Sequence, residues 1–135
     1  MANTFYPKGK EHWAKGDINW LGNTIMVQLI DLGAYTYSTL HEFLSDIPLG
    51  ARVGDPVEIA SGKTCTNGIL DGNDVVFLSL TGPTVEAFII YKDTTVEATS
   101  PLLMFFDTAV GLVLQPNSGN VPLVFDNGAN RIAKL

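Results

Sequence analysis

The sequence is poor in cysteine and in charged residues, and both shortages exclude classes of protein. Cys65 is its single cysteine, so the chain has no internal disulfide and no cluster of thiolate metal ligands. Charged residues make up 16% of the chain, against about 25% in typical domains. So little charge leaves apolar surface exposed, and we expect some of it to meet another subunit, most simply in a homo-oligomer.

Clustered basic residues and long apolar runs are missing as well. The net charge is −6, from 14 acidic and 8 basic residues, which excludes nucleic acid and anionic membrane surfaces as direct ligands. The longest apolar run is about six residues, whereas a helix needs about 20 to span a bilayer. The N-terminal stretch also lacks the apolar region of a secretory signal. We therefore expect synthesis and folding in a reducing cytoplasm.

What the sequence does contain is a regular series of short strand-like segments. Its 135 residues, punctuated by 13 glycines and 7 prolines, fit a single domain over 1–135, with 1–22 as an N-terminal arm. Strands are predicted over 23–31, 56–60, 63–70, 75–80, 85–92, 102–107, 111–115 and 121–125. Asn67-Gly68 is a candidate turn or bulge, and 116–120 a hairpin connection. This spacing predicts a mainly all-β fold, a β-sandwich or barrel-like domain with one short helix.

The short helix is predicted over residues 38–48. Ser38 or Thr39 can cap its start, Glu42 lies at capping-box spacing from Thr39, and Pro48 ends it. Its apolar side chains recur at helical spacing, at Leu40, Phe43, Leu44 and Ile47. We expect this helix to pack as a lid on the sheet.

No segment carries a catalytic or metal-binding signature. The stretch SGKT (61–64) resembles the end of a phosphate-binding loop, but the required earlier glycine is Val57, so a turn is the better interpretation. His41 has no second histidine four residues later, where Ser45 stands, and Cys65 has no histidine near it in the sequence. We predict no enzyme activity, no catalytic residues, no cofactor and no bound metal.

Two neighbouring segments are apolar on both faces. In 102–107, strict alternation places Leu102, Met104 and Phe106 on one face, with Leu103 and Phe105 on the other. The segment 88–91 is similarly apolar, and we expect the two to be adjacent antiparallel strands. A sandwich buries one face of each sheet. The second face is therefore covered either by the predicted helix or arm, or by another protein.

The aromatic side chains of the N-terminal arm offer a second hint of a partner. Phe5, Tyr6 and Trp13 are the kind of side chain that anchors interfaces. The arm either docks on its own domain or clamps a neighbour. Together with Leu103 and Phe105, these three aromatics are the candidate protein–protein interface.

Several segments resemble, in their order, a family of small virion structural proteins of tailed bacteriophages. They are LGNTIMVQLID (21–31), HEFLSDI (41–47), EAFIIYKDT (86–94), SPLLMFFD (100–107) and FDNGANRIAKL (125–135). The resemblance spans nearly the whole chain, apart from residues 49–73, and consists of strand and turn motifs.

The resemblance implies a non-enzymatic capsid decoration protein, bound in many copies to the outer head surface of the virion after synthesis in the host cytoplasm. Its partners would be the major capsid protein or other virion proteins. A tail, collar or fibre component that binds the host surface is the alternative, and no residues can be nominated for a hydrolase.

Overall fold

A computed structural model describes residues 3–109, 111–126, 128–129 and 131–135. The strands are β1 (Thr4–Phe5), β2 (Ile25–Ile30), β3 (Arg52–Glu58), β4 (Thr64–Thr66), β5 (Ile69–Asp71), β6 (Val75–Phe77), β7 (Ala87–Lys92), β8 (Leu102–Phe106), β9 (Val121–Leu123) and β10 (Ala133–Lys134). The helices are α1 (Pro7–Ala14) and the 3₁₀ turns η1 (Leu44–Asp46), η2 (Leu49–Ala51) and η3 (Glu97–Thr99). The expected fold class, a mainly β domain with one short α-helix, is confirmed.

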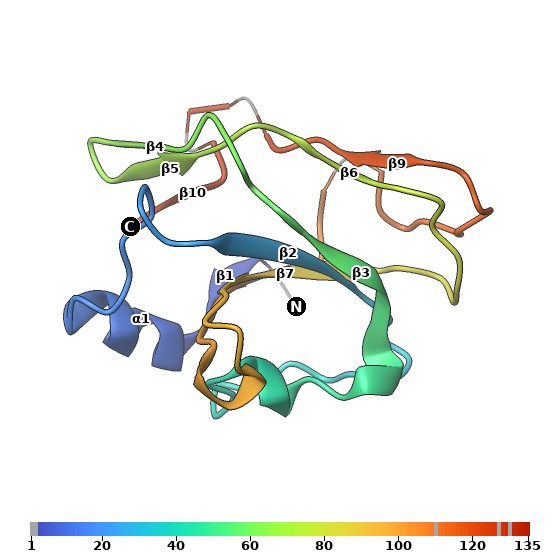
Figure 1. The fold of residues 1–135 in the computed structure, drawn as a ribbon, viewed down its shortest axis with the longest axis horizontal. Coiled ribbons are helices and arrows are strands. Elements are labelled where there is room, and N and C mark those ends of the chain that lie inside the picture. Colours follow the sequence, from blue (N-terminus) through green and yellow to red (C-terminus); the bar gives the residue numbers. More distant parts are fainter. Residues whose placement is uncertain (1–2, 110, 127, 130) are drawn as a thin grey trace.

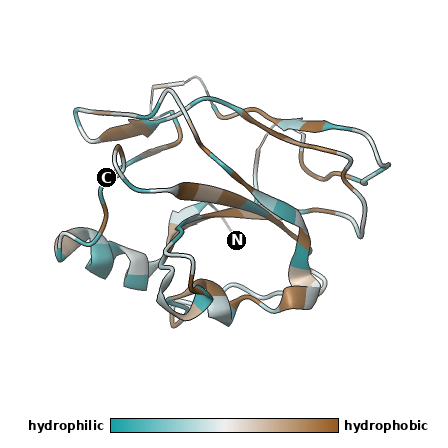
Figure 2. Cartoon of the chain, in the orientation of Figure 1, coloured by the Kyte–Doolittle hydropathy of each residue, from teal (hydrophilic) through white to brown (hydrophobic). Residues whose placement is uncertain are grey.

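The strands form one large sheet with two small sheets above it (Figure 1). The large sheet has the order β1-β8-β7-β2-β3, and the small ones are β10-β5-β4 and β6-β9, all with antiparallel pairs. Hydrophobic positions lie along β2 and on the small sheets (Figure 2). The layers therefore stack as in a sandwich, with apolar side chains between them.

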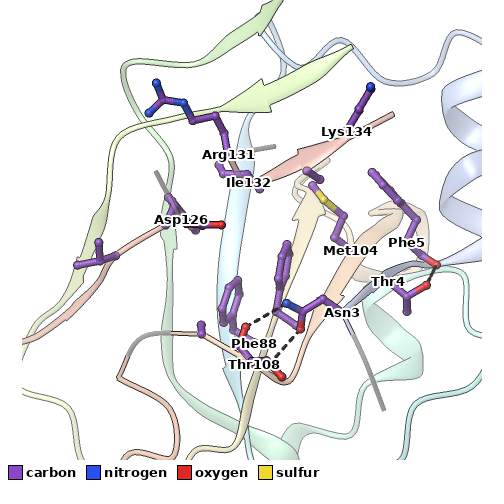
Figure 3. Close-up of a pocket in the computed structure, with 15 residues that line it drawn as sticks. Asn3, Thr4, Phe5, Phe88, Met104, Thr108, Asp126, Arg131, Ile132 and Lys134 are labelled. Carbon is purple, nitrogen blue, oxygen red and sulfur yellow. Dashed lines mark hydrogen bonds between the residues drawn. The ribbon is translucent and has the colours of Figure 1, made fainter. Parts of the chain in front are cut away.

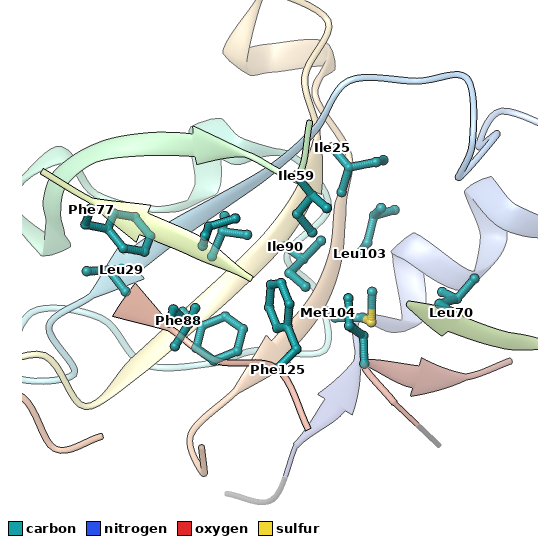
Figure 4. Packing of buried hydrophobic residues seen from close by; sticks show 14 of the residues in the cluster. Ile25, Leu29, Ile59, Leu70, Phe77, Phe88, Ile90, Leu103, Met104 and Phe125 are labelled. Carbon is teal, nitrogen blue, oxygen red and sulfur yellow. The ribbon is translucent and has the colours of Figure 1, made fainter. Parts of the chain in front are cut away.

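The large sheet is buried on both faces by two hydrophobic cores. The sandwich core lies toward the small sheets and includes Ile25, Leu29, Phe88, Ile90 and Met104 (Figure 4). The second core lies on the opposite face and is formed by Tyr6, Ile30, Tyr35, Leu44, Ile47, Ala51, Ala87, Ile89, Tyr91, Leu102 and Phe105. Tyr6 and the segment 35–51 of the same chain therefore cover the second face of the large sheet.

The hairpin of β7 and β8 contains an irregularity that strict alternation did not predict. The two strands are antiparallel neighbours, as expected, with Ile89 opposite Phe105 and Ile90 opposite Met104. Next along the ladder, Tyr91 lies opposite Leu102, so Leu103 is an extra residue in β8. This bulge turns Leu103 into the sandwich core beside Met104 and places Leu102 in the second core with Phe105.

A second irregularity lies between β2 and β3, where the pairing register shifts between Val27 and Leu29. Gln28 at this point is 2% exposed. Its side-chain amide donates to the carbonyl oxygens of Leu29 (3.2 Å), Val53 (3.2 Å) and Gly54 (3.0 Å). The buried side-chain amide therefore provides hydrogen bonds to main-chain carbonyl oxygens where the pairing register shifts.

The predicted helix over 38–48 is wrong. The main chain there pairs with the start of β8: Leu44 N–H donates to Ser100 O (2.9 Å), and Leu102 N–H donates to Glu42 O (2.8 Å). Only the single turn η1 forms, and Leu40 is 80% exposed. Tertiary pairing has replaced the helical hydrogen bonds that the local pattern favoured.

The predicted hairpin of 111–115 with 121–125 is also wrong. The only β-contact described for 111–115 is an isolated bridge between Leu114 and Val85. The later segment forms β9, which pairs with β6. The predicted strand 63–70 is two strands, β4 and β5, and Asn67 and Gly68, with positive φ of 55° and 76°, form the turn between them.

The N-terminal arm docks on its own domain over its described residues. β1 pairs with β8, and α1 follows with Pro7 at its first turn. Trp20 is 3% exposed, and its indole N–H donates to the carbonyl oxygen of Asp71 (3.0 Å). Residues 3–22 are therefore part of the packed domain.

Candidate functional site

The candidate interface residues divide into core residues and half-buried ones. Tyr6, Leu103 and Phe105 are 0%, 0% and 1% exposed. These three are therefore core residues in this structure and offer no contact surface to a partner. The bulge in β8 places Leu103 in the sandwich core, and residues 35–51 cover Phe105. Phe5 and Trp13 are half-buried at the margin of the sandwich core.

A chain of hydrogen bonds crosses the second core. The hydroxyls of Tyr6 and Tyr35 are 2.9 Å apart, and the Tyr35 hydroxyl lies 2.7 Å from His41 Nδ1. Burial raises the pKa of Tyr6 and raises that of Tyr35 to about 12. Both tyrosines therefore keep their protons at neutral pH and serve as hydrogen-bonding groups of the core.

His12 links α1 to two other segments through carboxylates. Its Nδ1 lies 2.8 Å from Asp17 Oδ2, and its Nε2 lies 3.0 Å from Glu42 Oε1. Because a carboxylate only accepts hydrogen bonds, both contacts form together when the ring carries hydrogen on both nitrogens. The hydrogen bond from His12 lowers the pKa of Asp17. The arrangement ties the helix to the domain, a structural role.

Arg52 makes a similar link between two 3₁₀ turns. Its guanidinium donates to Leu44 O (2.9 Å), Ile47 O (2.7 Å) and Glu97 Oε1 (2.9 Å). The bond from Arg52 lowers the pKa of Glu97. This cation therefore connects η1 to η3.

A cavity of about 700 Å³ lies between β1, β7 and β8 on one side and the C-terminal residues on the other (Figure 3). Its lining is mostly apolar, and Phe88 and Phe106 stack there with ring centroids 4.6 Å apart. The lining residues are Asn3, Thr4, Phe5, Phe88, Met104, Phe106, Thr108, Ala109, Val124, Phe125, Asp126, Arg131, Ile132, Ala133 and Lys134. Such volume and lining suit the binding of an apolar group.

An apolar surface lies on the outer side of the β6–β9 sheet. Val75, Phe77 and Leu123 point inward and are at most 4% exposed. By alternation, the side chains between them point outward, where Val76 pairs with Pro122. We call Val76, Leu78, Pro122 and Val124 the outer apolar face; Val76, Leu78 and Val124 are 44%, 72% and 38% exposed.

Sequence reasoning found Phe5, which lines the cavity, but missed both the cavity and the outer apolar face. The cavity joins residues from the two ends of the chain, and no local pattern reports that approach. The outer face did have a local signal: Val76 stands between the buried Val75 and Phe77 of β6, and the apolar Leu78 follows in the next turn.

Neither surface brings together groups suited to acid–base or metal chemistry. Within the described ranges, no group of three or more His, Cys, Asp or Glu could hold a metal ion. Cys65 is a free, exposed cysteine on β4. No helix in the described part of the chain is long and apolar enough to cross a membrane. What the two surfaces can do is bind apolar groups of another molecule.

Comparison with known proteins found no family model that matches this chain and no match among curated proteins.

Proposed function

We propose that the chain is a non-enzymatic structural protein of a tailed-bacteriophage virion, bound in many copies to the outer surface of the head as a decoration protein. Its partners would be the major capsid protein or other virion proteins, including copies of itself. The proposal begins from the order of motifs that resembles small virion structural proteins, from residues 21–31 to 125–135.

The outer apolar face is the observation in the structure that supports this proposal best. Leu78 is 72% exposed in the turn that follows β6, and Val76 on the paired strand itself is 44% exposed. Full burial of a Val or Leu side chain stabilises an association by about 1.5–3 kcal/mol. A protein present in many copies could hold to a particle through such modest contacts repeated at each site.

The first test is the copy number on purified particles. We expect hundreds of copies per particle, and the same number on heads that lack tails, measured by quantitative mass spectrometry against the major capsid protein. A handful of copies that appear only with tails would replace this proposal by the alternative, a tail, collar or fibre component that binds the host surface.

The second test concerns the contact itself. The double variant Val76→Asp, Leu78→Asp introduces charge into the outer apolar face without touching either core. We expect at least about 3 kcal/mol weaker binding to particles, which is roughly a hundredfold, with an unchanged melting temperature.

The matched control is Leu40→Asp, which charges an 80% exposed side chain in the segment below the large sheet (Figure 1). It should bind particles as the parent chain does. Normal binding by the double variant would show that the outer apolar face makes no contact with the particle.

A further inference from the structure

A second, smaller cavity of about 350 Å³ lies on the face of the large sheet that is turned away from the small sheets (Figure 1). Residues of β2, β3 and β7, of η1 and of the segment 93–97 line it. Thr95 and Glu97 of this lining are exposed, and Met26, Pro56 and Asp93 are half-buried. The cavity is therefore open at its mouth, and we call it the Tyr91 pocket after the tyrosine in its lining.

The hydroxyl group of Tyr91 has no hydrogen-bond partner of its own. Tyr91 lines the pocket and is 2% exposed, and its hydroxyl neither donates nor accepts a hydrogen bond within the described residues. Burial raises the pKa of Tyr91 to about 12, and the nearby carboxylate of Asp93 adds to the rise. The hydroxyl therefore keeps its proton at neutral pH. Because buried polar groups are almost always hydrogen-bonded, this hydroxyl requires a partner from outside the chain.

Two further acceptor groups line the same pocket. Gln28 is 2% exposed, and its amide nitrogen already donates to three main-chain carbonyls, so its amide oxygen is left as an acceptor. Asp93 Oδ1 accepts the N–H of Thr95 (2.8 Å), and no partner for Asp93 Oδ2 is found among the described residues. With the hydroxyl oxygen of Tyr91, the pocket offers acceptors on three side chains.

The charges of the lining favour a cation as the ligand. Arg52 donates to Glu97 Oε1 (2.9 Å), so these two opposite charges offset each other. The remaining charge among the residues that line the pocket is the carboxylate of Asp93. An anion would be repelled by this carboxylate, and it would find Arg52 Nη2 already bonded to three acceptors.

The pocket also has an apolar wall, formed by Met26 of β2, Leu44 of η1 and Pro56 of β3. Lysine-like side chains bury their hydrocarbon stems along such walls, while the ammonium group makes polar contacts. A volume of about 350 Å³ is at the lower end of the range for ligand sites, about 300–1,000 Å³. The pocket therefore suits a small cationic group on a short aliphatic stem.

We propose that the Tyr91 pocket binds a primary alkylammonium group. Its three N–H groups donate to Gln28 Oε1, to the hydroxyl oxygen of Tyr91 and to Asp93 Oδ2, and its stem lies against the apolar wall. The lysine side chain of a partner protein and a free alkylamine such as a polyamine both have this chemistry. The inference does not depend on the particle role, since it needs only the pocket.

The test titrates the isotope-labelled full chain with small ligands and follows the main-chain amide signals of β2, β7 and residues 93–97 by NMR. Butylamine carries both the ammonium group and the stem. Butanol lacks the charge, butyltrimethylammonium lacks the N–H donors, and butanoate has the opposite charge. We expect saturable, millimolar binding of butylamine, because it has few atoms, and binding at least about tenfold weaker for the other three.

Two larger amines distinguish the sources of the ammonium group. Tighter binding of Nα-acetyl-lysine amide than of spermidine would support a lysine of a partner protein as the ligand. Tighter binding of spermidine would support a free polyamine. Both results require the same alkylammonium site.

Variants of the chain locate the binding. Asp93→Asn removes the charge and keeps an oxygen that accepts from Thr95, and Tyr91→Phe removes only the hydroxyl; each should weaken butylamine binding at least about tenfold. Tyr91→Phe should not lower the melting temperature, because the hydroxyl makes no hydrogen bond within the described residues. Glu11→Gln is the matched control, since it removes an exposed carboxylate of α1 that does not line the pocket. This variant should bind butylamine as the parent does.

Four results would overturn the proposal. Absence of saturable binding by all three amines would show that the pocket holds solvent alone. Equal binding of butanol or butyltrimethylammonium would show that the ammonium N–H groups are not recognised, and tighter binding of butanoate would make this an anion site at Arg52. Equal binding of butylamine by the parent, Asp93→Asn and Tyr91→Phe would place the amine elsewhere on the chain.

Discussion

Gly9 is the residue through which the docking of α1 on the large sheet can be tested most directly. It is buried in the first half of the helix and faces the main chain of β8. A Cβ added at Gly9 would lie closer than 3.0 Å to the carbonyl oxygen of Leu102, and 3.2 Å from the Cα of Leu103. Because both neighbours are main-chain atoms, no side chain can rotate away to make room.

The Gly9→Ala substitution therefore sets two effects of opposite sign against each other. Alanine in a helix interior is favoured over glycine by about 1 kcal/mol. Overpacking costs about 1–3 kcal/mol, and contact with a paired strand belongs at the upper end of that range. We expect a net loss of about 2 kcal/mol in the free energy of unfolding, which lowers the melting temperature by roughly 6–10 °C.

Urea denaturation followed by tryptophan fluorescence measures this change, since Trp13 belongs to α1 and its ring centroid lies 6.5 Å from that of Trp20. The control is Gly50→Ala, because a Cβ at Gly50 meets nothing within 4 Å. Gly50→Ala should be neutral or slightly stabilising. If Gly9→Ala is stabilising instead, helix propensity dominates, and α1 does not pack against β8 as described.

Three further predictions concern the stability of the core and the stability of the protein at acidic pH. Gln28→Leu should lower the free energy of unfolding by about 1–3 kcal/mol, because it leaves main-chain carbonyls unpaired. Met26→Leu on the same strand should lower it by less than about 1.5 kcal/mol. The urea concentration at the midpoint of unfolding, measured for both variants, tests this difference. The lowered pKa of Asp17 means that its stabilisation is present above pH 3.8 and is lost as the pH falls through the folded pKa. Asp17→Asn should therefore flatten the acid limb of a stability–pH curve, and a curve equal to that of the parent chain would contradict the His12 contact. Phe105→Ala should lower the free energy of unfolding of the isolated chain by about 3–5 kcal/mol. An unchanged melting temperature would show that this ring lies outside the core.

The sequence predicted those parts of the fold that depend on short-range patterns. Apolar runs at 23–31 and 85–92 contain β2 and β7, and the positive φ preference of Asn67-Gly68 marks its turn. Antiparallel pairing of β7 with β8 followed from two apolar segments joined by a short polar connector. Local chemistry was sufficient for these elements.

The remaining features depend on residues that are distant in the sequence. Residues 38–48 have helical spacing, with Thr39 and Glu42 at capping-box spacing, yet the main chain of Glu42 and Leu44 pairs with Leu102 and Ser100 at the start of β8. The bulge at Leu103 has no local marker and reverses which side chains face which core. For the same reason the cavity was not predicted, since the strands β1 and β10 that line it are far apart in the sequence.

The pairing of β1 with β8 also has a consequence for how the protein folds. The side chain of Asn3 bonds main-chain groups of Asp107 and Thr108, across 104 and 105 positions of sequence. Contacts of such separation close large loops and slow folding. During synthesis the first strand must wait for β8 to leave the ribosome. Phe5 and Tyr6 therefore stay uncovered by this sheet until β8, about a hundred residues later in the sequence, has been synthesised.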